Sequence, residues 1–207
     1  MVAVIIGGSG SGKSEYAESL AVQYTETQLV YIATMQPFDK ESIKRVERHQ
    51  KMRKEKHFET IESYTNLEKI RVLPKTTILL ECMSNLIANE MFSDSGTRQR
   101  ANINPNSSTN LETNTNFETN TSPSTGEIVL DAVKKGIKNL IQQTDNLIIV
   151  TNNVFEDGSM YDFETLEYLK ILGEINQWIS VIADQVIEVV HGIPIDLYTH
   201  QSVDRRA

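Results

Sequence analysis

The chain has 207 residues, of which 39% are hydrophobic and 23% are charged, a composition that suits one α/β domain. Its net charge of −8 argues against a general nucleic-acid-binding protein. A lone cysteine, Cys82, excludes an internal disulfide, and no run of about 18 apolar residues predicts a membrane span. Because the sequence also shows no signal peptide, we expect a cytoplasmic protein.

Short apolar runs rich in β-branched residues alternate with helical patterns along the chain. The runs occupy residues 2–6, 29–33, 77–81, 146–151 and 186–190. Each run is almost continuously apolar, which is typical of strands buried on both faces of a parallel sheet. Helical patterns cover residues 14–24, 39–56, 128–141 and 161–183. The alternation predicts an α/β fold with a mostly parallel sheet flanked by helices.

Two segments do not follow this alternation. Residues 93–127 are rich in Asn, Thr and Ser, and they contain the repeat TNLETN, TNFETN. Because such a segment has few apolar side chains to offset the entropy of ordering, we expect a surface insertion without a chemical role. Residues 199–207 are expected to be a frayed tail. The whole chain, residues 1–207, is otherwise predicted to form a single domain.

Residues 7–14 read GGSGSGKS and fit the phosphate-binding pattern G-x-x-x-x-G-K-[ST], between a predicted strand and a predicted helix. Glycines let backbone N–H groups surround a phosphate, the lysine adds positive charge, and the serine hydroxyl can bind Mg²⁺. The alternative is a flexible Gly/Ser turn. We therefore predict that the phosphates of a nucleoside triphosphate are bound by Gly7, Gly8, Ser9, Gly10, Ser11, Gly12, Lys13 and Ser14.

Glu81 is the last residue of the apolar run at 77–81. P-loop enzymes place an acid at the end of such a strand, where it binds Mg²⁺ directly or through water. The alternative is a solvated acid at a strand end. We predict that Ser14 and Glu81 together hold Mg²⁺.

A basic cluster stands out in this acidic chain; it comprises Lys44, Arg45, Arg48, Lys51, Arg53, Lys54 and Lys56. On a helix, Arg45, His49 and Arg53 would share one face. An arginine side chain can bind two phosphate oxygens at once through two parallel hydrogen bonds, and an imidazole nitrogen can attack phosphorus. A solvated basic face is the alternative interpretation.

Taken in order, the motifs resemble a known family. They are GGSGSGKS at 7–14, RVERH at 45–49, TIE at 60–62, LLEC at 79–82 and IIVTN at 148–152. This set is similar to the bifunctional adenosylcobinamide kinase/adenosylcobinamide-phosphate guanylyltransferases of cobalamin biosynthesis. The resemblance covers most of the chain apart from the predicted insertion and tail.

The resemblance implies a RecA-like P-loop fold, a homotrimer and two reactions. The hydroxyl of adenosylcobinamide, a corrinoid, would be phosphorylated with ATP or GTP, and GMP from GTP would then be transferred to that phosphate through a covalent histidine adduct. His49 matches the histidine, with His57 as the weaker candidate, and Lys13 would assist catalysis at the phosphates. Nucleotide contacts are implied for Ala33, Thr34, Met35, Gln50, Lys51, Met52, Arg53, Glu62 and Glu81.

Two other functions stay open on the residues alone. A generic small-molecule P-loop kinase would use the P-loop and Glu81 but would leave His49 without a role. A regulatory nucleotide-binding protein would bind nucleotide without forming a covalent adduct. Gly10, Asn153 and Phe155 also depart from the usual residues of the family, so the guanylyltransferase motifs are matched better than the loop expected to face the corrinoid.

Overall fold

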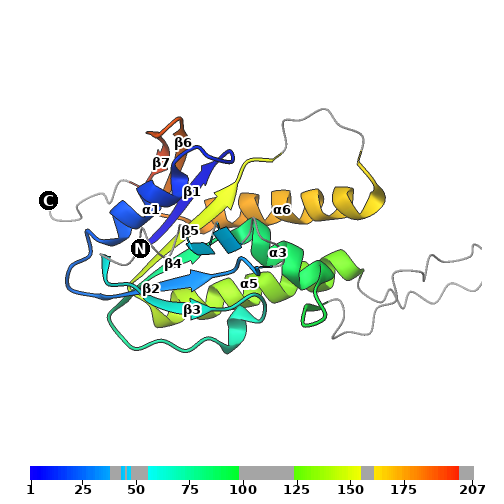
Figure 1. Ribbon diagram of the computed structural model, residues 1–207, viewed down its shortest axis with the longest axis horizontal. Helices are drawn as coiled ribbons and strands as arrows, with labels where there is room; N and C mark the ends of the chain where they lie inside the picture. The colour runs from blue at the N-terminus through cyan, green and yellow to red at the C-terminus, as the bar shows by residue number, and fades with distance from the viewer. Residues whose placement is uncertain (38–42, 45, 48–55, 98–123, 155–160, 201–207) are drawn as a thin grey trace, which may run out of the picture.

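The computed structural model describes residues 1–37, 43–44, 46–47, 56–97, 124–154 and 161–200. These residues form one seven-stranded sheet with helices packed on both of its faces (Figure 1). In chain order the elements are β1 (Val2–Gly7), α1 (Lys13–Ala21), β2 (Gln28–Ala33), β3 (Glu59–Glu62), the 3-10 helix η2 (Leu67–Lys69), β4 (Thr76–Glu81), α3 (Met83–Phe92), α5 (Thr125–Gln143), β5 (Asn146–Asn152), α6 (Phe163–Ile182), β6 (Gln185–Val190) and β7 (Ile193–Thr199).

The strand order in the sheet is β3-β2-β4-β5-β1-β6-β7. All neighbouring strands run parallel except β6 and β7, which form an antiparallel pair. The predicted α/β fold with a mostly parallel sheet is therefore confirmed. In this order β5 separates β1, which leads into the phosphate-binding loop, from β4, which carries Glu81.

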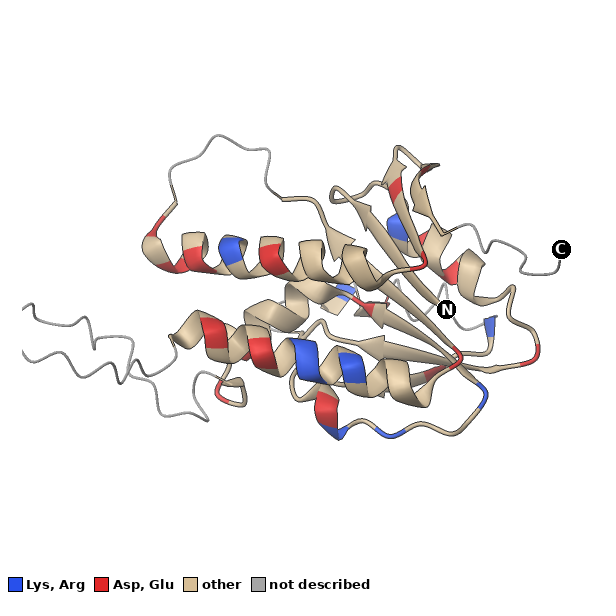
Figure 2. Cartoon of the chain, turned by 180° about the vertical axis from the view of Figure 1, so that it is seen from behind, with Lys and Arg blue, Asp and Glu red and all other residues tan. Residues whose placement is uncertain are grey.

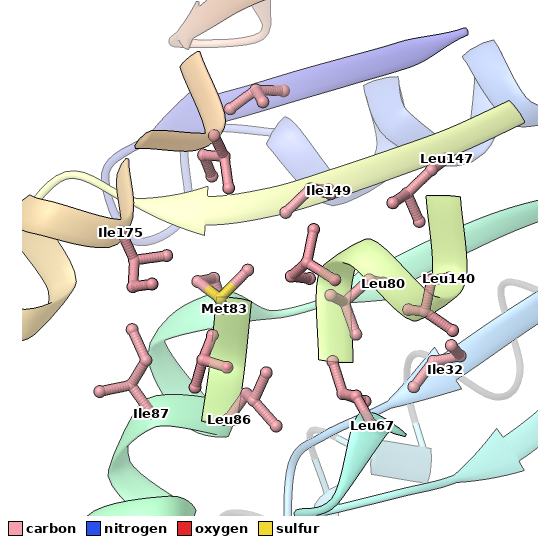
Figure 3. Packing of buried hydrophobic residues seen from close by; sticks show 14 of the residues in the cluster. Ile32, Leu67, Leu80, Met83, Leu86, Ile87, Leu140, Leu147, Ile149 and Ile175 are labelled. Atoms are coloured by element: carbon pink, nitrogen blue, oxygen red, sulfur yellow. The ribbon is translucent and has the colours of Figure 1, made fainter. Parts of the chain in front are cut away.

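Alternating strand residues supply two apolar layers, one on each face of the sheet. The larger layer lies under α3, α5 and α6, and Figure 3 shows part of it: Ile32, Leu67, Leu80, Met83, Leu86, Ile87, Leu140, Leu147, Ile149 and Ile175. The smaller layer lies under α1, where Ala17 and Ala21 pack with Ile5, Ile148 and Val150. Burying a side chain of the size of leucine contributes roughly 1.5–3 kcal/mol, so the larger layer dominates the stability of the fold.

The two long helices begin at capping residues that the sequence supplies. Ser124 and Glu127 form a reciprocal capping box at the start of α5, and the hydrogen bonds from Ser124 hold the pKa of the Glu127 carboxyl below its usual value. Asp162 caps α6 by accepting a hydrogen bond from the backbone N–H of Thr165 at 2.8 Å. Charged residues are spread along both helices (Figure 2). Among the described residues, no helix could span a membrane.

Several boundaries differ from the sequence predictions. The expected insertion at 93–127 is too long, because α5 already begins at Thr125 and because Thr97 is buried. Thr97 donates two hydrogen bonds to the buried carboxylate of Glu90, from its backbone N–H at 2.8 Å and from its hydroxyl at 2.5 Å. The expected tail also begins too early, because Thr199 ends β7 and the N–H of His200 donates to the carbonyl of Asp184. Residues 98–123 and 201–207 lie outside the described residues.

These contacts set the limits of a deletion that should be tolerated. Replacing residues 98–123 with a short Gly/Ser linker should change the melting temperature by only a few degrees, because loop-closure entropy varies slowly with length, about 0.6 kcal/mol per doubling. Extending the deletion to 97–125 should lower the melting temperature further, because the Thr97 hydrogen bonds and the Ser124 cap are then lost. The cap alone contributes about 1 kcal/mol. Thermal unfolding of both variants tests this. Equal melting temperatures would contradict the assigned boundaries.

Candidate active site

The loop between β1 and α1 has the geometry of a phosphate cradle. Gly10 and Gly12 adopt positive φ angles of 72° and 91°, which favour glycine. The N–H of Ser11 donates to the Gly8 carbonyl at 3.2 Å, and α1 starts directly after Gly12. The segment Gly8–Gly10 is exposed. An anion approaching this exposed segment meets the amino-terminal end of α1, with its partial positive charge.

Two of the loop glycines are also required by close packing. A Cβ atom on Gly7 would lie 2.6 Å from both the Ser11 hydroxyl oxygen and the Val189 carbonyl oxygen. A Cβ atom on Gly12 would lie 3.2 Å from the Cα atom of Gly192, in the turn between β6 and β7. The N–H of Gly192 donates to the Ser11 carbonyl at 2.7 Å. The β6–β7 turn therefore braces the phosphate-binding loop.

Lys13 folds back into the loop. Its ammonium donates to the Gly8 carbonyl at 2.9 Å, and the residue is only 8% exposed. Burial lowers the pKa of Lys13, and the neighbouring Glu81 carboxylate acts in the opposite direction. The loop thus holds a desolvated positive charge at its centre, where it attracts phosphate more strongly than a surface lysine would.

Glu81 meets Ser14 at the same edge of the sheet. The Ser14 hydroxyl donates to one carboxylate oxygen of Glu81, and the Tyr31 hydroxyl donates to the other at 3.0 Å. Two adjacent oxygen ligands beside a phosphate-binding loop suit Mg²⁺, which takes only one or two protein ligands and completes its shell with water and phosphate. The described residues contain no group of three or more His, Cys, Asp and Glu side chains that could hold a metal.

A cavity opens at the carboxyl ends of β2, β3 and β4. In the sheet register Ala33 pairs with Glu62 on one side and with Glu81 on the other. The cavity is lined by Tyr31, Ala33, Met35, Pro37, Val46, Thr60, Glu62, Tyr64, Glu81, Cys82 and Asn85. The structure therefore brings together most of the nucleotide-contact residues expected after the second strand and at 60–62. Val46, which precedes His49 by three positions, lines the same cavity.

Thr34 is the exception among these residues, because it does not line the cavity. Its hydroxyl donates to the Cys82 carbonyl at 2.8 Å and accepts from the Cys82 N–H at 2.7 Å. Its carbonyl accepts from the Asn89 side-chain amide at 2.8 Å. Thr34 thus fixes the start of α3 to the end of β2.

The predicted nucleophile lies outside the described residues, together with Gln50, Lys51, Met52 and Arg53 of the expected nucleotide site. His57 is described: it lines a separate hollow with Gln28, the first residue of β2. That position is at the opposite end of β2 from Ala33 and from the cavity. The placement therefore gives no support to His57 as the nucleophile.

Some residues of the site were not predicted from the sequence. Tyr31 contacts Glu81. The Tyr64 hydroxyl donates to a Glu62 carboxylate oxygen at 2.9 Å. Burial is the main cause of the raised pKa of Tyr64, and this hydrogen bond is the second cause. Asn152, at the end of β5, was quoted only within the motif IIVTN and was given no role, although a polar residue that ends an apolar run is a usable signal. Burial raises the pKa of the Cys82 thiol, in agreement with its interpretation as a small buried hydrophobic residue.

A family model described as cobinamide kinase / cobinamide phosphate guanyltransferase matches residues 3–197. The chain belongs to this family. Members of this family are kinases and guanylyltransferases, so the predicted enzyme class is confirmed. The family also implies nucleotide and corrinoid substrates. The resemblance inferred from the ordered motifs is confirmed as well.

Two curated relatives of the same family carry the name bifunctional adenosylcobalamin biosynthesis protein CobU. The protein from Escherichia coli is 26% identical over 204 residues, which cover 95% of this chain and 99% of the relative. The protein from Salmonella typhimurium is 26% identical over 200 residues, with the same coverage. A solved structure, the flagellar accessory protein FlaH from Methanocaldococcus jannaschii, superposes with a TM-score of 0.44 at 12% identity, covering 96% of this chain and 78% of FlaH.

Proposed function

We propose that this enzyme transfers the guanylyl group through a covalent adduct on His49. An imidazole nitrogen attacks the α-phosphorus of GTP; a P–N bond forms, the bond to the bridging oxygen breaks, and pyrophosphate leaves. A phosphate oxygen of adenosylcobinamide phosphate then attacks the same phosphorus. The P–N bond breaks, the histidine is restored, and adenosylcobinamide-GDP is formed.

In the kinase reaction, the hydroxyl of adenosylcobinamide attacks the γ-phosphorus of ATP or GTP. A new P–O bond forms, the bond from the γ-phosphorus to the bridging oxygen breaks, the nucleoside diphosphate leaves, and the hydroxyl proton is released to solvent. The loop from Gly7 to Ser14 binds the phosphates in both reactions. Lys13 supports this role, because its buried ammonium lies inside the loop and can neutralise charge that builds up on a departing polyphosphate. One loop serving both reactions explains why the chain carries a single pattern of this kind.

We assign the Mg²⁺ site to Ser14 and Glu81, whose oxygen atoms are in contact beside the loop. When bound there, Mg²⁺ would offset negative charge on the phosphates. Tyr31 holds the Glu81 carboxylate by a hydrogen bond, so the carboxylate is already oriented toward the loop. The described residues offer this oxygen pair and no His/Cys cluster for a softer metal.

The guanine nucleotide is proposed to occupy the cavity lined by Ala33, Met35 and Glu62. Gln50, Lys51, Met52 and Arg53 complete the proposed nucleotide site, and Thr34 supports it from outside the cavity by joining the end of β2 to the start of α3. A carboxylate such as that of Glu62 accepts hydrogen bonds, and the Watson–Crick edge of guanine offers N–H donors. The hydrogen bond from Tyr64 orients this carboxylate.

The observation that carries the proposal is the convergence of the phosphate-binding loop, Glu81 and this cavity at one edge of the sheet. Incubation with α-³²P-labelled GTP, followed by denaturing electrophoresis, tests it. A radioactive band that is lost in acid and stable in base would report a P–N bond. If the wild-type protein binds GTP but never becomes labelled, the covalent mechanism is wrong.

We also propose that the chain assembles into a homotrimer in the cytoplasm. A contact surface between subunits is offered by β7, an edge strand on which the apolar residues Ile193 and Leu197 are 65% and 56% exposed. The variant with both Ile193→Lys and Leu197→Lys should lower the mass measured by size-exclusion chromatography with light scattering to that of a monomer. Val181→Lys, at an 80% exposed apolar residue of α6, serves as the control and should leave the mass unchanged. A double variant that keeps the wild-type mass would exclude β7 as the interface.

A further inference from the structure

Asn152 ends β5 at the edge of the sheet that holds the phosphate-binding loop. Because β5 lies between β1 and β4, Asn152 has the loop on one side and Glu81 on the other. Its register partner on β1 is Gly7, the first residue of the loop motif, while Val150 pairs with Glu81. The backbone N–H of Asn153 donates to the Gly7 carbonyl at 3.1 Å, so the pairing continues to the base of the loop.

The side chain of Asn152 lies on the same face of the sheet as α1. Ile148 and Val150 belong to the apolar layer under α1, and side chains along a strand alternate between the faces. Thr151 confirms the alternation, because its hydroxyl donates to Asn176 of α6 on the opposite face. Glu81 meets Ser14 of α1, so both polar residues at this edge face the helix that begins at Lys13.

A short network holds the Asn152 amide in place. Its Nδ2 atom donates to the Ser84 hydroxyl oxygen at 2.5 Å and makes a second, longer hydrogen bond to the Cys82 sulfur at 3.9 Å. Ser84 is only 5% exposed, and its hydroxyl oxygen lies 3.0 Å from the Cys82 sulfur. An amide nitrogen carries two hydrogens, and the bond to the sulfur is long and weak, so a charged phosphate oxygen at the end of β5 is a strong enough acceptor to replace it.

We propose that Asn152 donates a hydrogen bond to the terminal phosphate of the nucleotide bound by the loop, and that Ser84 is a positioning residue which orients the amide. The inference rests on the proposed function, because it requires the phosphates to lie along Gly7–Ser14. A triphosphate that begins in the loop and extends toward Ser14 and Glu81 must cross the end of β5, where this amide lies. The amide transfers no proton; it holds the terminal phosphorus in line for the hydroxyl that attacks it.

The test compares triphosphate with diphosphate. GTP and GDP analogues with a methylene bridge between the α- and β-phosphorus atoms cannot donate a guanylyl group, so their affinities can be measured by calorimetry in the presence of Mg²⁺. Asn152→Ala should weaken binding of the GTP analogue by about tenfold or more, and the affinity for the GDP analogue should stay within about twofold of the wild-type value. Asn146→Ala, at the other end of β5, is the matched control and should change neither affinity.

Two further variants keep the inference falsifiable if Asn152→Ala folds poorly. Asn152→Asp has almost the same size but places a carboxylate beside the phosphate, so it should weaken the GTP analogue more than the alanine variant does. Ser84→Ala should weaken the GTP analogue several-fold and spare the GDP analogue. Equal losses for both analogues, or no loss for either, would overturn the inference. If instead the wild-type protein fails to bind either analogue, the proposed function of the loop is itself wrong.

Discussion

His49→Ala should abolish the labelled adduct formed from α-³²P-labelled GTP. Alanine has no nitrogen that can attack the α-phosphorus, so no P–N bond can form and the label should fall to background. Transfer of GMP to adenosylcobinamide phosphate should fall by at least about a hundredfold, because the two-step route is closed. The adduct is measured by denaturing electrophoresis, and the transfer by release of pyrophosphate.

His57→Ala is the matched control, because His57 lines a hollow at the opposite end of β2 from the candidate site. It should become labelled at the wild-type rate. Circular dichroism and thermal unfolding should show that both variants keep the fold. Label that persists in His49→Ala and disappears in His57→Ala would reverse the assignment.

Lys13→Ala should damage both reactions. Its ammonium is held inside the loop against the Gly8 carbonyl, and each reaction builds negative charge on a departing polyphosphate. Removing one such electrostatic contact typically lowers kcat by about 10²–10³-fold. The measurements are the rate of self-labelling by GTP and kcat/KM for phosphorylation of adenosylcobinamide.

Lys135→Ala provides the control for loss of a positive charge, because Lys135 is exposed on α5. It should leave both rates unchanged. The informative contrary outcome is a Lys13→Ala enzyme that is labelled at a normal rate but no longer phosphorylates adenosylcobinamide. Such an enzyme would use separate nucleotide sites for the two reactions, and the proposal of a single shared loop would be wrong.

The central part of the fold could be predicted from the sequence because its strands are buried on both faces. Runs such as VAVII and TILLE read as continuous apolar segments, and each corresponds to a strand in the sheet. The edge strands β3 and β7 were not predicted. Every residue of β7 is exposed and it contains Pro194, while only Ile61 of β3 is half-buried, so neither strand has a distinctive apolar pattern. Helix α3 was not predicted either, because its apolar residues directly follow those of β4 and cannot be told apart from them in the sequence.

The position of the candidate site could be predicted where it depends on local sequence. The loop at 7–14 and the acid at the end of β4 are both found where the motifs indicated. The contacts that orient these residues come from distant parts of the chain. Tyr31 meets Glu81 across 50 positions, and Asn152 meets Ser84 across 68. Spacing alone does not reveal such pairs, because only the strand order brings them to one edge.

The place of β1 in the strand order has a consequence for the way the chain is made. Its two neighbours in the sheet, β5 and β6, begin at Asn146 and Gln185, so the strand of this sheet that is synthesised first is among the last to find its partners. The β6–β7 turn, which braces the loop through Gly192, is made later still. A nascent chain that ends before this turn therefore carries the complete GGSGSGKS motif without the contacts that shape it. Competence to bind nucleotide should appear only after the β6–β7 turn has been synthesised.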